Sequence, residues 1–172
     1  MNSMYDREAV APLWKELVEV GVDSLTTVEE VDAVLKENTG TTLVIVNSVC
    51  GCAAGSARPG VALALQNSVI PDRLTTVFAG VDREATNRAR EFMKGIPPSS
   101  PCVALFKDGQ LVYMLQRSDI EGNTPQTIAS HLKTAFDNTC SRTGPSVATE
   151  VFQKAFGLDA DPACGSTFKI KQ

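Results

Sequence analysis

The chain has 172 residues, 43% of them hydrophobic and 21% charged, and its formal net charge is −4 at pH 7. This composition predicts one globular domain of ordinary size that buries a core without disulfide staples. The acidic balance argues against binding to nucleic acids or to a membrane surface. The longest aliphatic run, Leu43–Val46, is too short to span a bilayer, and no secretory pattern opens the sequence, so we expect a cytoplasmic protein.

Helices and strands alternate along the first half of the chain. Two amphipathic helices come first, and the β-branched run Leu43–Asn47 then predicts a buried central strand. A helix follows from Ala53 to about Val69, and Pro59 is expected to kink it. A second strand at Leu74–Ala79 leads into a helix that Asp82 caps.

The second half adds a hairpin and a final helix. A proline-dense loop, Gly95–Pro101, precedes two strands at Cys102–Phe106 and Gln110–Leu115, which Lys107–Gly109 joins. Asp-Gly between two such runs is a strong hairpin signal. A last helix begins at Thr124. This order predicts a mixed sheet of about four strands with helices on both faces, which is an α/β sandwich.

Residues from about 141 onward differ in character from the rest. We interpret residues 1–140 as the main domain and residues 141–172 as a C-terminal extension. The extension is expected to hold a short helix up to about Phe156, a loop at Asp159–Gly165 and an edge strand at Thr167–Lys171.

The most informative motif is Cys50-Gly51-Cys52, where the central strand runs into a helix. A thiolate at a helix start is stabilised by exposed backbone N–H groups and by the helix dipole. Thiol–disulfide exchange needs such an ionised attacking thiol and a second thiol close enough to resolve the mixed disulfide. Cys50 and Cys52 therefore form a candidate catalytic pair.

The one-residue spacing limits what this pair does well. The ring that a Cys50–Cys52 disulfide closes is small, so it has difficulty reaching the preferred dihedral angle. Strain of this kind makes a couple more oxidising. The spacing favours disulfide isomerisation or the clearing of mixed disulfides over general reduction.

Pro101 is the third element of the predicted site. It follows Ser100 and precedes a strand, and X–Pro bonds are those in which the cis form is accessible. The sheet order places this loop at the same end as the cysteines, where a cis bond exposes backbone polar groups to an extended substrate. Gly51, Ser100 and Pro101 are therefore the candidate substrate-binding residues. Arg58 is expected at the surface, close enough to favour a nearby thiolate.

The other cysteines leave alternatives open. Cys102 is either a core residue or a third thiol near the site. Cys140 and Cys164 pair with each other, act as a secondary couple or have no redox role. A closed zinc or iron–sulfur site needs four ligands, and the sequence has no second cysteine pair and a single histidine, His131, which is expected at the surface. A metal site is therefore not expected, although Cys50 and Cys52 alone leave a metal-delivery module as an alternative.

Several motifs, in the right order, resemble those of the bacilliredoxins, thioredoxin-like proteins with a Cys-Gly-Cys motif that are also described as disulfide isomerases. The matching segments are Asn47–Ala53 with Ala57–Pro59, Asp72–Leu74 with Val77–Gly80, and Pro97–Pro101 with Lys107–Gly109. The similarity covers roughly residues 5–140. It implies a thioredoxin-like three-layer α/β/α sandwich in which Pro101 is the cis-proline.

The resemblance also implies a reaction. It is the reduction of mixed disulfides between cytosolic proteins and bacillithiol, a low-molecular-weight thiol of some bacteria. Cys50 attacks and takes up the bacillithiol, and Cys52 or a second free thiol regenerates it. No cofactor is implied beyond bacillithiol as thiol substrate or reductant. Cys102, where a small residue is usual, and the extension with Cys164 depart from the pattern and leave the resolving thiol open.

The sequence therefore predicts a cytoplasmic thiol–disulfide oxidoreductase whose partners are proteins carrying mixed disulfides and a low-molecular-weight thiol. A general protein disulfide isomerase is the alternative within the same chemistry. A metal-binding or metal-delivery module is the alternative of another class.

Overall fold

The computed structural model describes residues 3–36, 39–160 and 168–170. Its centre is a five-stranded sheet in the order β1-β4-β2-β5-β6. The strands are β1 (Asp23–Ser24), β2 (Thr41–Asn47), β4 (Arg73–Phe78), β5 (Cys102–Lys107) and β6 (Gln110–Leu115). β4 runs parallel to β1 and β2, and β5 is antiparallel to both β2 and β6. The predicted mixed sheet is confirmed, with the short β1 added at one edge.

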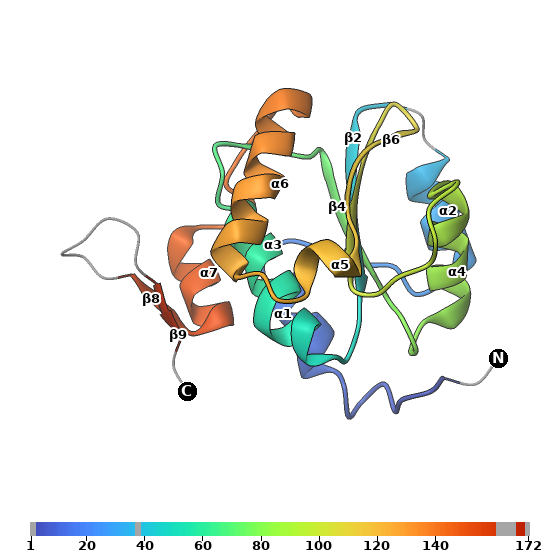
Figure 1. Cartoon of the computed structure of the whole chain (residues 1–172), viewed down its shortest axis with the longest axis horizontal. Helices are drawn as coiled ribbons and strands as arrows, with labels where there is room; N and C mark the ends of the chain where they lie inside the picture. The colour runs from blue at the N-terminus through green and yellow to red at the C-terminus, as the bar shows by residue number, and fades with distance from the viewer. Residues whose placement is uncertain (1–2, 37–38, 161–167, 171–172) are drawn as a thin grey trace.

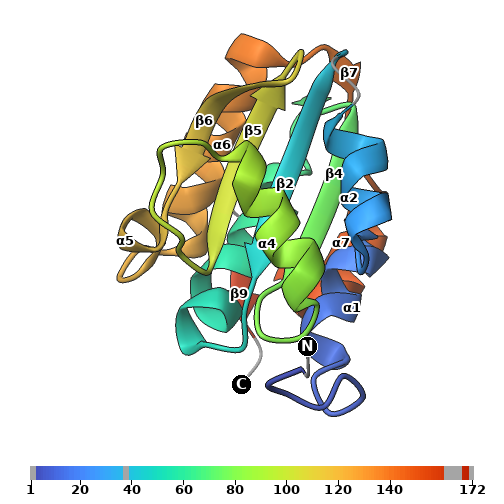
Figure 2. The same cartoon turned by 90° about the vertical axis from the view of Figure 1, so that its right-hand side faces the viewer.

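Helices cover both faces of this sheet. They are α1 (Pro12–Glu19), α2 (Val28–Leu35), the π-helical turn η1 (Ala53–Ala57), α3 (Arg58–Ala64), α4 (Arg83–Phe92), α5 (Arg117–Ile120), α6 (Pro125–Thr139) and α7 (Thr149–Phe156). Figure 1 shows α1, α3, α6 and α7 on one side and α2 and α4 on the other, and Figure 2 looks onto the α4 side. The thioredoxin-like three-layer sandwich is thus confirmed. None of the described helices has both the length and the apolar character needed to span a bilayer.

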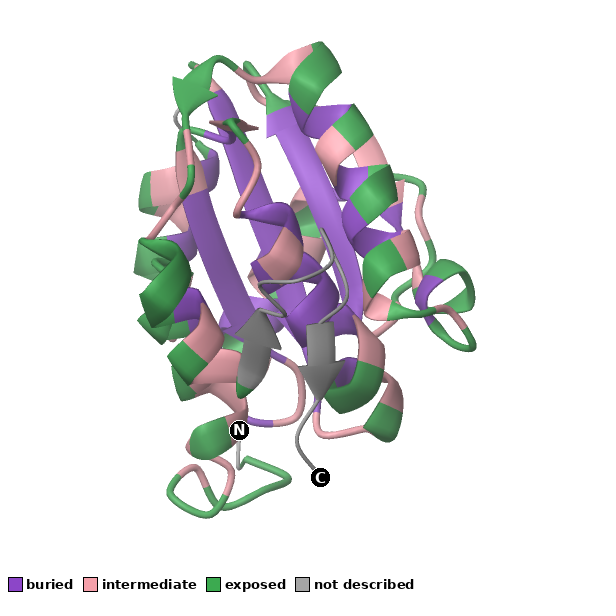
Figure 3. Cartoon of the chain, turned by 90° about the vertical axis from the view of Figure 1, so that its left-hand side faces the viewer, coloured by how far each residue is buried: buried purple, intermediate pink, exposed green. Residues whose placement is uncertain are grey.

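β2 lies at the middle of both cores. All seven of its residues are buried, since its two edges pair with β4 and β5 and helices cover its two faces. Leu43 and Ile45 face the α1, α3 and α6 layer, and Val44 and Val46 face the α2 and α4 layer. Figure 3 shows the strands as the buried centre of the molecule. A continuous apolar run is what a strand covered on both faces requires.

Two predicted details of the helices are wrong. The helix after the cysteines ends at Ala64 and not near Val69, because the chain then leads into β3 (Val69–Ile70), which pairs with β7 (Arg142–Thr143). Its division into η1 and α3 falls beside Pro59, where a kink was expected. Asp82 precedes α4 but makes no side-chain cap, because its carboxylate forms an ion pair with Arg7 instead.

The chain beyond residue 140 contributes to the core. α7, the predicted short helix, packs against α1 and α3, and Phe152 is fully buried in the same cluster as Leu17 and Phe136. Ser146 bonds the carbonyl oxygens of Leu65 and Val20 through its backbone N–H and its hydroxyl. β8 (Leu158–Ala160) and β9 (Phe168–Ile170) form a separate pair, so β9 extends no edge of the central sheet. Cys164 and most of the predicted Asp159–Gly165 loop lie outside the described residues, and the domain boundary at residue 140 stays a prediction.

Removing the Phe152 ring tests whether α7 is an integral part of the fold. Phe152→Ala empties a fully buried site, so we expect the free energy of unfolding to fall by about 3–5 kcal/mol in urea titrations. Val151→Ala, on the exposed face of the same helix, is the matched control and is expected to change it by less than about 0.5 kcal/mol. Equal, small effects of both variants would show that α7 docks without supporting the core.

Candidate active site

Cys50 lies three residues beyond the end of β2, at the point where the chain turns into the π-helical turn. The carbonyl oxygen of Cys50 accepts hydrogen bonds from the N–H groups of Ala53 (3.1 Å) and Ala54 (3.2 Å), which close the first turn. The predicted position of the cysteines at the start of a helix is therefore confirmed. π-Helical turns are rare overall, and those that occur are often found at functional sites. Here the turn separates the cysteines from the regular helix α3.

The Cys50 sulfur has several hydrogen-bond donors around it. Its Sγ lies 3.1 Å from Ser48 Oγ and accepts a hydrogen bond from the Ala53 N–H at 3.4 Å. Burial raises the pKa of the Cys50 thiol, but hydrogen bonds from Cys52, Ser48 and the Ala53 N–H outweigh burial and lower the pKa below its ordinary value. Cys50 is half-buried, so its thiolate remains accessible.

Cys52 has the opposite electrostatic situation. Burial and the neighbouring Cys50 sulfur raise the pKa of the Cys52 thiol, and the Arg117 charge opposes this shift. These opposite shifts make Cys50 the first of the two to ionise, which agrees with its predicted role as the attacking thiol. Sequence reasoning missed Arg117, which comes from α5 and reaches the site only through the fold.

A buried network holds the strand end that carries Cys50. Arg58 is 2% exposed, which corrects the prediction of a surface residue. Its Nη1 donates to Asn47 Oδ1 (3.2 Å) and to the Ser48 carbonyl oxygen (3.1 Å), and its Nε forms an ion pair with Glu16. Asn47 Nδ2 in turn donates to the Leu13 carbonyl oxygen at 2.8 Å. Arg58 therefore positions the segment from which Ser48 bonds Cys50, and its pairing with Glu16 was not visible in the sequence.

The loop before β5 lies beside the cysteines, as predicted. The Ser100–Pro101 bond is cis, and Cys102, the next residue, pairs with Val46 near the end of β2. Arg117 Nη1 lies 3.5 Å from the Ser100 carbonyl oxygen. The arginine whose charge acts on Cys52 therefore also contacts this loop. Gly51 is exposed, and a methyl group added there would meet nothing within 4 Å, so the face above the pair is open.

The two other described cysteines have surroundings unlike those of Cys50. Cys102 is 1% exposed in the α2 and α4 core, and burial raises its pKa to about 11. Cys140 is half-buried and bonds Thr41, the first residue of β2, whereas Cys50 follows the last, so roughly 20 Å of strand separates them. In the part of the chain that the structure describes, no three His, Cys, Asp or Glu side chains are grouped to hold a metal ion. His131 is exposed, as expected.

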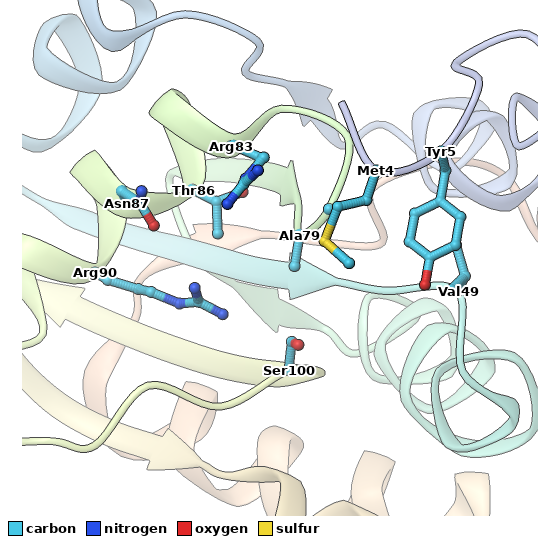
Figure 4. Close-up of a pocket in the computed structure, with 10 residues that line it drawn as sticks. Met4, Tyr5, Val49, Ala79, Arg83, Thr86, Asn87, Arg90 and Ser100 are labelled. Atoms are coloured by element: carbon cyan, nitrogen blue, oxygen red, sulfur yellow. The ribbon is translucent and has the colours of Figure 1, made fainter. Parts of the chain in front are cut away.

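A polar cavity of about 330 Å³ lies between α4 and the residues that precede Cys50 and Pro101. Val49 and Ser100 line it on the side of the pair, and one face of α4 lines the other, as Figure 4 shows. The α4 residues are Arg83, Thr86, Asn87 and Arg90, whose i, i+3, i+4, i+7 spacing places them on one face of the helix. Sequence reasoning missed this face, although the spacing of its polar residues was visible.

Comparisons with known proteins match most of the chain. A family model described as disulphide isomerase matches residues 5–140. A bacilliredoxin of Halalkalibacterium halodurans is 58% identical over 127 residues, 74% of this chain and 87% of that protein. One of Cytophaga hutchinsonii is 52% identical over 134 residues, 78% and 98% of the two chains. One of Staphylococcus aureus is 50% identical over 137 residues, 80% and 94% of the two chains.

Among solved structures, the oxidised thioredoxin of Plasmodium falciparum superposes with a TM-score of 0.48 and 14% identity over 67% of this chain and 99% of that one.

The acidity of Cys50 is tested by its alkylation rate against pH, followed by peptide mass spectrometry. Because hydrogen bonds lower the pKa of Cys50, its thiolate persists at lower pH than that of an ordinary cysteine and is lost only as the pH falls through the lowered value. Cys50 is expected to react first, and the buried Cys102 last. A midpoint for Cys50 at or above that of free cysteine would contradict the assignment of the nucleophile.

Ser48→Ala isolates one of these hydrogen bonds. The loss of its hydroxyl is expected to raise the pKa of Cys50 and to slow alkylation at neutral pH by roughly threefold to tenfold, the equivalent of about 1 kcal/mol. Ser56→Ala is the matched control, since the Ser56 hydroxyl, in the π-helical turn after the cysteines, bonds the Asn123 carbonyl oxygen instead. Equal rates for the two variants would exclude Ser48 from stabilising the thiolate.

Proposed function

The chain belongs to the disulphide isomerase family, which its similarity to bacilliredoxins supports, and on that premise we propose that it removes bacillithiol from mixed disulfides of cytosolic proteins. The chemistry is that of a thiol–disulfide oxidoreductase with a thioredoxin-like fold. The observation that carries the proposal is the opposite tuning of two adjacent thiols: the pKa of Cys50 is lowered and that of Cys52 is raised.

The first step is an exchange at the sulfur of bacillithiol. The Cys50 thiolate attacks that sulfur, and the bond between it and the substrate cysteine breaks. The substrate protein leaves as a thiolate, which takes up a proton, and bacillithiol is now bound to Cys50 through a disulfide. No net oxidation occurs in this step, because one disulfide replaces another.

The second step regenerates Cys50, and the electrostatics favour Cys52 as the resolving thiol. Once Cys50 is in a mixed disulfide it carries no negative charge, so one cause of the raised pKa of Cys52 disappears, while Arg117 still lowers it. Cys52 loses its proton and attacks the Cys50 sulfur, and bacillithiol leaves as a thiolate. The Cys50–Cys52 disulfide that forms holds the oxidising equivalents. Two molecules of an external thiol such as bacillithiol reduce it in two exchanges and leave as their own disulfide, and both cysteines return to thiols.

General protein disulfide isomerase activity is the second candidate, and the description of the family favours it. It uses the same nucleophile on disulfides within one protein. Rescue of a scrambled protein without any bacillithiol distinguishes this activity from the removal of bacillithiol.

A trapping experiment tests the proposed reaction. When a bacillithiolated protein is added, Cys52→Ser is expected to accumulate bacillithiol on Cys50, because the resolving thiol is missing. Intact-mass and peptide mass spectrometry measure the adduct, and Cys50→Ser is the control that forms none. If Cys52→Ser releases the substrate protein and gains no adduct, the proposed mechanism is wrong.

The choice of the resolving thiol is tested by removing the others. Cys140→Ala is expected to retain release of bacillithiol from Cys50, because Cys140 lies at the opposite end of β2. Cys102→Ala is also expected to retain it, since Cys102 is buried and its pKa is about 11. Stopped turnover with intact folding in either variant would assign resolution to that cysteine.

A further inference from the structure

The cavity that Val49 and Ser100 line has mostly polar residues on its α4 side. Its floor is the α4 face with Arg83, Thr86, Asn87 and Arg90, and its rim includes Val49 and Ser100. In Figure 4 the guanidinium groups of Arg83 and Arg90 extend from α4 into the space between that helix and Ser100. The residues that line it thus connect α4 with the neighbours of both Cys50 and Pro101.

The N-terminal segment completes the wall of this cavity. The Met4 N–H donates to the Gly80 carbonyl oxygen at 2.7 Å, and the Tyr5 ring lies so close to Gly80 that an added Cβ would come within 2.9 Å of it. Gly80 has a φ of +85°, a conformation that side chains rarely adopt. The glycine therefore allows Met4 and Tyr5 to close the end of the cavity nearest Val49.

Two polar atoms in this lining have no hydrogen-bond partner in the described part of the chain. They are Thr86 Oγ1, on a residue that is 1% exposed, and Arg90 Nε. A buried donor without a partner costs about 1–3 kcal/mol, and native proteins seldom leave one without a reason. A ligand with acceptor atoms would satisfy both groups.

The charge of the cavity is opposite to that of the whole chain. Two arginines line it and no aspartate or glutamate does, although the chain carries a net charge of −4. The nearby Asp82 carboxylate is already paired with Arg7. Guanidinium groups bind carboxylates through two parallel hydrogen bonds, so the preferred ligand is an anion.

We propose that this cavity binds the carboxylate-bearing part of the low-molecular-weight thiol that is joined to Cys50 in the mixed disulfide. Arg90 pairs with the carboxylate, and Thr86 and Asn87 supply further hydrogen bonds. The inference rests on the proposed function for the sulfur chemistry and adds a selectivity for anionic thiols. The cavity thereby distinguishes an acidic thiol from a neutral one at a position away from the exchanging sulfurs.

The test measures how strongly Cys50 retains a thiol with free carboxylates and the same thiol with its carboxylates esterified. Cys52→Ser protein is equilibrated with reduced and oxidised glutathione, or with reduced and oxidised glutathione diethyl ester, and intact-mass spectrometry gives the fraction of mixed disulfide. The ratio of the two exchange constants reports the preference for carboxylates. Arg90→Gln is expected to lower this ratio by roughly tenfold or more, the size of one hydrogen bond to a charged group.

Two further variants separate a change in ligand preference from a loss of folding. Asn87→Asp places a negative charge in the cavity at an exposed position and is expected to lower the ratio as well. Arg88→Gln removes a cation from the same helix, but one that pairs with Asp32 and Glu91, so it is the matched control and is expected to leave the ratio unchanged. Equal ratios in all four proteins would overturn the inference.

Bacillithiol in the same assay separates this inference from the proposed function. An adduct of bacillithiol on Cys50 with equal glutathione ratios in every variant leaves the proposed function standing and refutes the cavity. A ratio that falls in Arg90→Gln and Asn87→Asp, with no bacillithiol adduct in Cys52→Ser, supports the cavity and refutes the proposed function.

Discussion

A single buried cation organises the end of the central strand. β2 is buried on both faces, so the polar groups where it ends have little water to bond. The Arg58 guanidinium meets that requirement by binding Asn47, the Ser48 carbonyl oxygen and the Glu16 carboxylate. Burying a charge is costly unless it is paired and hydrogen-bonded, and Arg58 is both. The direction in which the chain leaves β2, and with it the place of Cys50, depends on this arrangement.

The reactivity of the cysteine pair follows from where donors stand around each sulfur. Ser48 and the Ala53 N–H direct hydrogen bonds to Cys50, while burial and the Cys50 sulfur raise the pKa of Cys52. One negative charge is therefore stable in the pair and a second is not. The same proximity makes the two thiols act in sequence, because the ionisation of Cys52 becomes easier once Cys50 has lost its charge in a disulfide.

Local patterns predicted most of the fold, and long-range partners account for what they missed. The apolar run of β2 and the Asp-Gly turn between β5 and β6 are signals that lie within a few neighbouring residues. Both strands of the hairpin were predicted to within one residue. The burial of Arg58 depends on its ion pair with Glu16, 42 positions away. Asp82 forms an ion pair with Arg7, 75 positions away, instead of capping α4. No window of sequence contains both members of such a pair. The sequence did not predict β1, because a strand of two residues is too short to show an alternating pattern.

Because β2 lies between two helical layers, different layers contribute the two groups of residues around the candidate site. On one side, α3 and α1 supply Arg58 and Glu16, which hold the strand end and thereby the sulfur. On the other side, α4 supplies the cationic face of the proposed ligand cavity, which reaches Val49 and Ser100 but none of the groups that bond Cys50. The positioning of the predicted nucleophile and the proposed recognition of the thiol it carries thus involve different layers. Because the two sets of residues share no member, the α4 face can change its ligand preference while the acidity of Cys50 stays as it is.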